Sequence, residues 1–70
     1  MTKDELIVTD REILGGTPVF AGTRVPVRAL FDCLQHGRSV EEFLDQFPSV
    51  RREQAQGLLD VALDAVLSHR

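Results

Sequence analysis

Glycine and proline are concentrated at the start of this sequence, and their distribution divides the chain near residue 26. Before that point, short runs of β-branched and aromatic residues alternate with glycines, a pattern typical of strands joined by tight turns. After it, apolar residues recur at helical spacing. We therefore predict an extended β arm with a small hairpin over residues 1–26, followed by helices.

Three helices are predicted from the apolar spacing and from the signals that start and stop a helix. Gly37 offers a left-handed cap, so the first helix is placed at 27–37. Ser39 and Glu42 have the spacing of a capping box, so the second helix is placed at 39–47. The predicted fold class is mainly α: a three-helix domain with an N-terminal arm and a short β-hairpin.

The third helix, predicted at 51–69, carries more apolar surface than two short helices can cover. From Leu58 to Leu67 only Asp60 and Asp64 are polar, and exposed apolar patches usually mark interaction sites. The predicted partner or oligomer interface consists of Leu58, Val61, Ala62, Ala65 and Val66, together with Val19 and Phe20 of the arm. The alternative left open is that the arm folds back over this surface.

The length of 70 residues predicts a single domain, 1–70, with a small core. Such chains are usually reinforced by a disulfide, a metal or a second subunit. A single cysteine, Cys33, excludes an internal disulfide, and the Cys and His residues lack the spacing of a zinc site. We therefore expect a homodimer, with no metal and no cofactor.

The hydropathy pattern and the first residues bear on location. No apolar run approaches the roughly 20 residues that span a bilayer, and the acidic start lacks the layout of a signal peptide. A cytoplasmic protein without membrane contact is the expectation.

The segment from residue 39 onward has a helix-turn-helix layout, in which the first turns of the second helix contact DNA. Arginine and glutamine side chains of the kind that reach base edges and phosphates occur there. The predicted DNA-contacting residues are Arg51, Arg52, Gln54 and Gln56, with Arg38 as a further phosphate contact. A packing role is the alternative, because the second helix carries Glu41, Glu42 and Asp45 and the net charge is −3.

An enzymatic function is not predicted. A chain this short has little interior in which to build a concave site with an acid, base or nucleophile held in place. Cys33 and His36 stand three residues apart on the first helix, but a cysteine there is more often a small core residue. The glycine pair lacks the spacing of a phosphate-binding loop.

The most distinctive run lies between the predicted strands and the first helix. Its fixed-geometry and polar residues are Gly15, Gly16, Pro18, Gly22, Thr23, Arg24 and Pro26. From the residues alone this run is predicted to be an architectural turn, and a ligand-binding loop is the weaker alternative.

With this run the sequence resembles the bacterial and archaeal family catalogued as domain of unknown function 433, whose hallmark is G-G-x-P-x-x-x-G-T-R-[IV]-P-V. The likeness extends from about Ile7 to Leu67. It implies a three-helix, homeodomain-like or winged-helix-type domain. The sequence departs from the family pattern at Arg51, where a Thr or Ser cap is usual, and at Gly57, where Ala is usual.

The resemblance also implies a function. Members are often encoded beside PIN-like ribonuclease toxins, which implies an antitoxin that binds and neutralises such a toxin and also binds its own promoter. The alternative is a protein-interaction or oligomerisation module that does not bind DNA.

Overall fold

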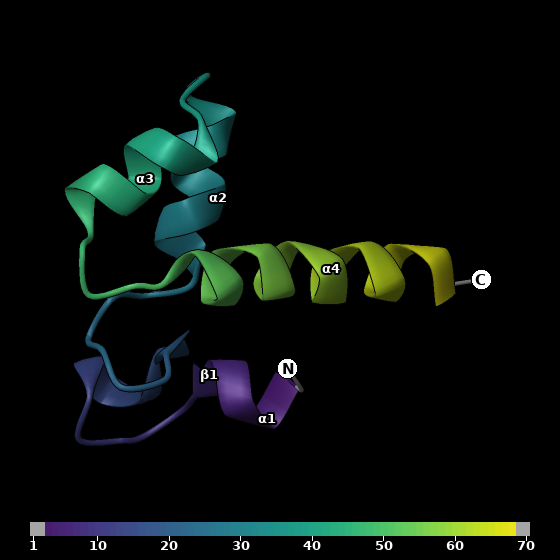
Figure 1. The fold of residues 1–70 in the computed structure, drawn as a ribbon. Helices are drawn as coiled ribbons and strands as arrows, with labels where there is room; N and C mark the ends of the chain where they lie inside the picture. The colour runs from purple at the N-terminus through teal and green to yellow at the C-terminus, as the bar shows by residue number, and fades with distance from the viewer. Residues whose placement is uncertain (1–2, 69–70) are drawn as a thin grey trace.

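The computed structural model describes residues 3–68, and it confirms a small, mainly helical domain with a short antiparallel strand pair near its start. The elements in chain order are α1 (Lys3–Leu6), β1 (Ile7–Val8), the 3-10 turn η1 (Leu14–Gly16), β2 (Val19–Phe20), α2 (Arg28–Gln35), α3 (Val40–Gln46) and α4 (Arg52–Ser68). In Figure 1, α2 and α3 stand above the start of α4, α1 lies below α4, and the last turns of α4 extend beyond all three. No helix in the described part of the chain is long and apolar enough to cross a membrane.

The strand pair is built from two distant parts of the arm. β1 and β2 are antiparallel, with Ile7 opposite Phe20 and Val8 opposite Val19. On the edge of β2 that faces away from β1, Val19 forms an isolated bridge with Pro26. The strands of the predicted hairpin region therefore use both edges of β2, and together they carry the chain to the start of α2.

A turn stabilised by Thr23 joins β2 to this bridge. The Thr23 hydroxyl donates to the Phe20 carbonyl at 2.8 Å and accepts from the Val25 amide at 3.0 Å. Gly22 has a φ of +77°, a left-handed conformation that other residues adopt at a cost. Arg24 is exposed and makes no side-chain hydrogen bond or ion pair with another described residue. Residues 20–25 thus form the turn that leads from β2 to the bridge at Pro26.

The start of the arm differs from the prediction, because Lys3–Leu6 form a helical turn rather than an extended segment. Acidic residues such as Glu5 are poor strand formers, and Leu6 holds the turn against α4. The Leu6 side chain is fully buried. A Cβ on Gly57 would lie 2.9 Å from both Leu6 δ-carbons, so α1 packs directly on the backbone of α4. Gly57 is thereby explained as a point of close approach.

The helix starts are specified locally. Ser39 accepts from the Glu42 amide at 3.1 Å, and the Glu42 carboxylate accepts from the Ser39 amide at 3.0 Å. This capping box fixes the start of α3 where the sequence predicts it. α3 then presents Phe43 to the interior.

The core lies where α2, α3 and the first half of α4 meet β2. Its cluster of buried residues is Phe20, Leu30, Cys33, Phe43, Val50, Ala55 and Leu58. The Phe43 ring stands 6.0 Å from that of Phe20 and 5.0 Å from that of Phe47, measured between centroids. Val19 is buried as well, 1% exposed.

Three residues predicted to face a partner are therefore core residues. Val19 and Phe20 are both buried because β2 is covered on both faces, and Leu58 is buried because it lies on the half of α4 that packs under α2 and α3. Their assignment to an interface is wrong. The remaining predicted members of that interface lie further along α4.

Candidate functional site

The start of α4 was the predicted DNA-contacting site, and Gln54 lies inside it rather than on its surface. The Gln54 side chain is 2% exposed. Its Oε1 accepts from the Arg51 amide at 2.9 Å, and its Nε2 donates to the Ala21 carbonyl at 2.9 Å. Gln54 thus caps the first turn of α4 and ties it to the loop after β2. Its prediction as a base-contacting residue is wrong, because both ends of the amide are used internally.

Arg52 is held by an acidic residue of the preceding helix. Its two terminal nitrogens donate to the two carboxylate oxygens of Glu41, one of them at 2.6 Å, in a bidentate pair that joins α3 to α4. The hydrogen bonds from Arg52 lower the pKa of Glu41, and those to Glu41 raise the pKa of Arg52. Both side chains are about half exposed. The positive charge of Arg52 is therefore balanced by Glu41 of the same chain.

The other predicted DNA-contacting residues do not form a positive surface. A terminal nitrogen of the Arg38 guanidinium lies 4.0 Å from a carboxylate oxygen of Glu42. Gln56 is exposed but lines a shallow groove whose remaining polar residues are acidic: Glu53, Asp60 and Asp64. Arg51 is exposed and forms no ion pair with another residue in the range 3–68. Of the five predicted residues, Arg51 alone is exposed and clear of a neighbouring carboxylate.

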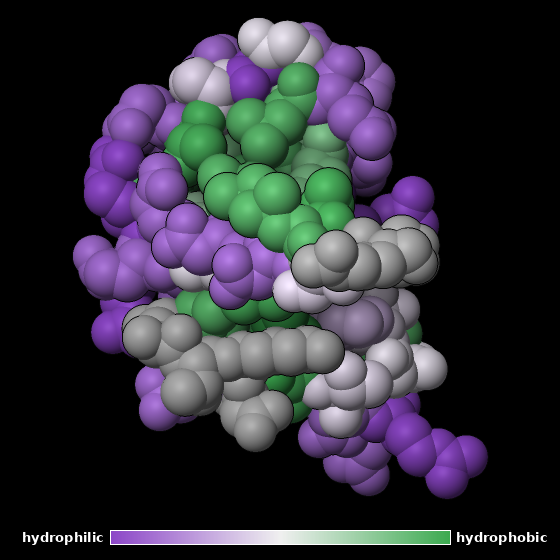
Figure 2. Space-filling model, turned by 90° about the vertical axis from the view of Figure 1, so that its right-hand side faces the viewer, coloured by the Kyte–Doolittle hydropathy of each residue, from purple (hydrophilic) through white to green (hydrophobic). Residues whose placement is uncertain are grey.

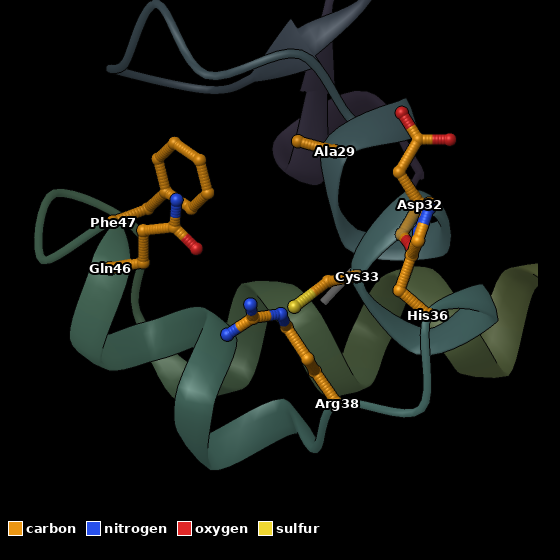
Figure 3. Close-up of a pocket in the computed structure, with 7 residues that line it drawn as sticks. All are labelled: Ala29, Asp32, Cys33, His36, Arg38, Gln46 and Phe47. Carbon is orange, nitrogen blue, oxygen red and sulfur yellow. The ribbon is translucent and has the colours of Figure 1, made fainter.

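A small pocket lies elsewhere, between α2 and the end of α3. Its volume is about 240 Å³, and it is lined by Ala29, Asp32, Cys33, His36, Arg38, Gln46 and Phe47. Figure 3 shows the Cys33 thiol and the Arg38 guanidinium directed toward its centre. The His36 Nδ1 lies 2.6 Å from the Asp32 carbonyl oxygen, so this ring nitrogen is engaged by its own helix. In the described part of the chain no group of His, Cys, Asp and Glu side chains converges as a metal site.

The second half of α4 leaves apolar side chains in solvent. We call Leu59, Ala62, Leu63, Val66 and Leu67 the α4 stripe, because these residues recur at helical spacing along one side of the helix. Leu59 and Ala62 are half-buried, whereas Leu63, Val66 and Leu67 are 56%, 71% and 68% exposed. Figure 2 looks at the side on which α4 ends and shows a broad hydrophobic area running upward toward the other helices.

The described part of the arm packs elsewhere on α4. α1 contacts α4 through Leu6 at Gly57, on the side opposite the stripe. Burying a Val or Leu side chain fully is worth about 1.5–3 kcal/mol, so three such side chains left mostly in water represent several kcal/mol of unused stabilisation in a chain whose core is small. A surface of this kind is typical of an interaction site.

The structure therefore separates the two predicted sites. Val61 and Ala62 are half-buried and Ala65 and Val66 exposed at the end of α4, while the residues predicted to contact DNA are mostly paired or buried. Leu63 and Leu67 are part of the exposed surface although the predicted interface did not include them. Their place on the same helical face was the available signal.

The sequence matches one family model over most of its length. The model of the family described as Protein of unknown function (DUF433) matches residues 7–61, more than half of the chain. The chain belongs to this family. The DUF433 match covers both strands, α2, α3 and the first half of α4, and it ends where the exposed part of the α4 stripe begins. Leu63, Val66 and Leu67 thus lie beyond the matched region.

One curated relative also resembles this DUF433 chain. The uncharacterized protein y4eO of Sinorhizobium fredii (strain NBRC 101917 / NGR234) is 44% identical over 50 residues, which are 71% of this chain and 23% of that protein. The chain thus matches less than a quarter of the relative's length. No solved structure matches the chain.

Proposed function

We propose that this chain is a regulatory protein of the antitoxin type, which acts by binding other protein chains and neutralises a PIN-like ribonuclease toxin. The observation that carries the proposal is the exposed α4 stripe, on which three large apolar side chains are more than half exposed. Exposed patches of this kind mark protein-binding surfaces. The class of partner rests on the expectation, implied by the sequence resemblance, that members of this family are encoded beside PIN-like toxins.

Inhibition of the ribonuclease encoded beside this chain tests the proposal. The purified chain, titrated into the purified ribonuclease, is expected to abolish RNA cleavage near equimolar ratio. Val66→Glu is expected to weaken inhibition at least about 10-fold, because a carboxylate is costly to desolvate in an apolar contact. Ser68→Glu is the matched control and leaves inhibition unchanged, because helical spacing places Ser68 on the opposite side of α4 from Val66. Full cleavage in a tenfold excess of the wild-type chain would contradict the proposal.

Binding to its own promoter is a second candidate, and Arg51 is the observation that favours it. Its exposed guanidinium stands at the start of α4, the second helix of the helix-turn-helix layout. With one such arginine per chain and a two-fold complex, log affinity should fall with log salt at a slope of about −2. A gel shift with upstream DNA, in a wild-type and an Arg51→Glu chain, measures this. Binding that is unaffected by Arg51→Glu would remove Arg51 from the site.

The alternative is a module that binds protein and not DNA. It is supported by Glu53 in the first turn of α4, whose carboxylate would repel phosphates, and by Glu41, which takes up the charge of Arg52. In this alternative the gel shift shows no complex while inhibition of the ribonuclease is retained. The antitoxin proposal stands in either case, since it depends on protein binding alone.

A further inference from the structure

The turn after α2 places a positively charged side chain at the edge of the small pocket between α2 and α3. Gly37 has a φ of +78°, the left-handed conformation with which many helices end. The next amide, that of Arg38, then donates back to the Cys33 carbonyl at 3.1 Å, as in a Schellman motif. Arg38 and Cys33 both line the pocket. The pocket is therefore bordered by a cation whose position is set by the backbone.

The inner wall of the pocket is apolar except for one thiol. Ala29 and Cys33 line it from α2, and Phe47 lines it from the end of α3 (Figure 3). The Cys33 side chain is only 8% exposed. Its thiol has no hydrogen-bond partner among residues 3–68. Since buried polar groups are nearly always paired, and a thiol is a weak donor, an occupant that carries an acceptor oxygen fits this wall.

The Arg38 guanidinium has donors to offer such an occupant. The 4.0 Å between its terminal nitrogen and a Glu42 oxygen is too long for a hydrogen bond. In Figure 3 the guanidinium and the Cys33 thiol point toward the centre of the pocket, whereas the Asp32 carboxylate is directed away from it. Asp32 pairs instead with Arg28, whose Nε lies 3.7 Å from a carboxylate oxygen. An arginine presented in this way binds a carboxylate through two parallel hydrogen bonds.

The size of the pocket limits the occupant to a small molecule. Its volume of about 240 Å³ is below the roughly 300–1,000 Å³ of sites that enclose drug-sized ligands. We propose that this pocket binds a small aromatic carboxylate, with the carboxylate on Arg38 and its single ring between Phe47 and Ala29. This inference goes beyond the antitoxin function, because it assigns a ligand to a surface other than the α4 stripe.

Benzoate is the probe that tests the pocket. Added to the ¹⁵N-labelled full chain at constant ionic strength, it is expected to shift the amide resonances of Ala29, Cys33 and Arg38, with a dissociation constant of about 0.1–1 mM. Benzamide has the same ring without the charge, and it is expected to bind at least about 10-fold more weakly. Arg38→Gln is expected to weaken benzoate binding by a similar factor. This variant should fold, because the Arg38 side chain is exposed, and circular dichroism checks this.

Arg24→Gln is the matched control, because it removes the charge of an exposed arginine that does not line the pocket. It is expected to bind benzoate like the wild type. The absence of shifts at about 20 mM benzoate, equal binding of benzamide, or equal binding by Arg38→Gln would each overturn the proposal. An equal loss in both arginine variants would also overturn it, since the shifts would then report general attraction to positive charge. Inhibition of the ribonuclease reads the α4 stripe and not this pocket, so the two proposals fail separately.

Discussion

Replacing Gln54 by Ala is expected to lower the free energy of unfolding by about 2–4 kcal/mol, because each buried group left without its hydrogen bond costs about 1–3 kcal/mol. The substitution removes the acceptor for the Arg51 amide and the donor to the Ala21 carbonyl. α4 then loses its cap, and the loop after β2 loses its tie to the helix. Urea unfolding followed by circular dichroism at a fixed protein concentration measures the change.

Gln56→Ala is the matched control, two residues away on the same helix. Gln56 is exposed and has no hydrogen bond to another described side chain, so the change should stay within about 0.5 kcal/mol. Equal losses of stability at both positions would mean that the Gln54 side chain does not link the start of α4 to the loop after β2. The pair also separates structure from DNA contact, since a base-contacting Gln54 would affect binding without loss of stability.

Replacing Phe43 by Ala is expected to unfold most of the protein, because truncating a buried Phe costs about 3–5 kcal/mol and a core of this size supplies about as much. Phe43 is fully buried and its ring lies between those of Phe20 and Phe47. The helical circular dichroism signal should fall toward that of an unfolded chain.

The graded control for this position is Phe43→Leu, which keeps much of the volume and should cost about 1.5 kcal/mol. That variant should remain folded with a lowered melting temperature. A Phe43→Ala chain with the wild-type signal and melting temperature would show that the aromatic row does not hold the core together.

The parts of the fold that depend on neighbouring residues could be predicted from the sequence. The capping pair Ser39 and Glu42 placed the start of α3 because both halves of the motif lie within one turn. Apolar spacing gave the helices and the exposed stripe in the same way. Gly22 and Thr23 predicted a turn because the backbone conformations that these residues favour also depend on local sequence.

The parts that depend on distant contacts could not be predicted. Gln54 looks like a surface residue in the sequence, and only its contact with Ala21, 33 residues away, explains its burial. One local signal was present, because a Gln three residues after a helix cap can reach back to the cap amide. The pairing of Arg52 with Glu41 similarly required the angle at which α3 meets α4.

One physical reason explains why some residues of the predicted interface lie in the core and others lie in solvent. Apolar pattern shows which side of a helix is hidden, but it does not show where the body of the protein ends. Leu58 and Val66 lie on the same broad apolar side of α4, yet the first is 4% exposed and the second 71%. The boundary between core and docking surface is set by how far α2 and α3 extend over α4.

The central claim is that the end of α4 is a surface covered by another chain. Hydrogen–deuterium exchange of the chain alone and of the chain mixed with the ribonuclease encoded beside it tests this claim directly, because protection that appears on mixing reports association. The account predicts slower exchange of residues 62–68 in the mixture, with β2, α3 and the first half of α4 unchanged. Identical exchange across α4 in the two samples would contradict it.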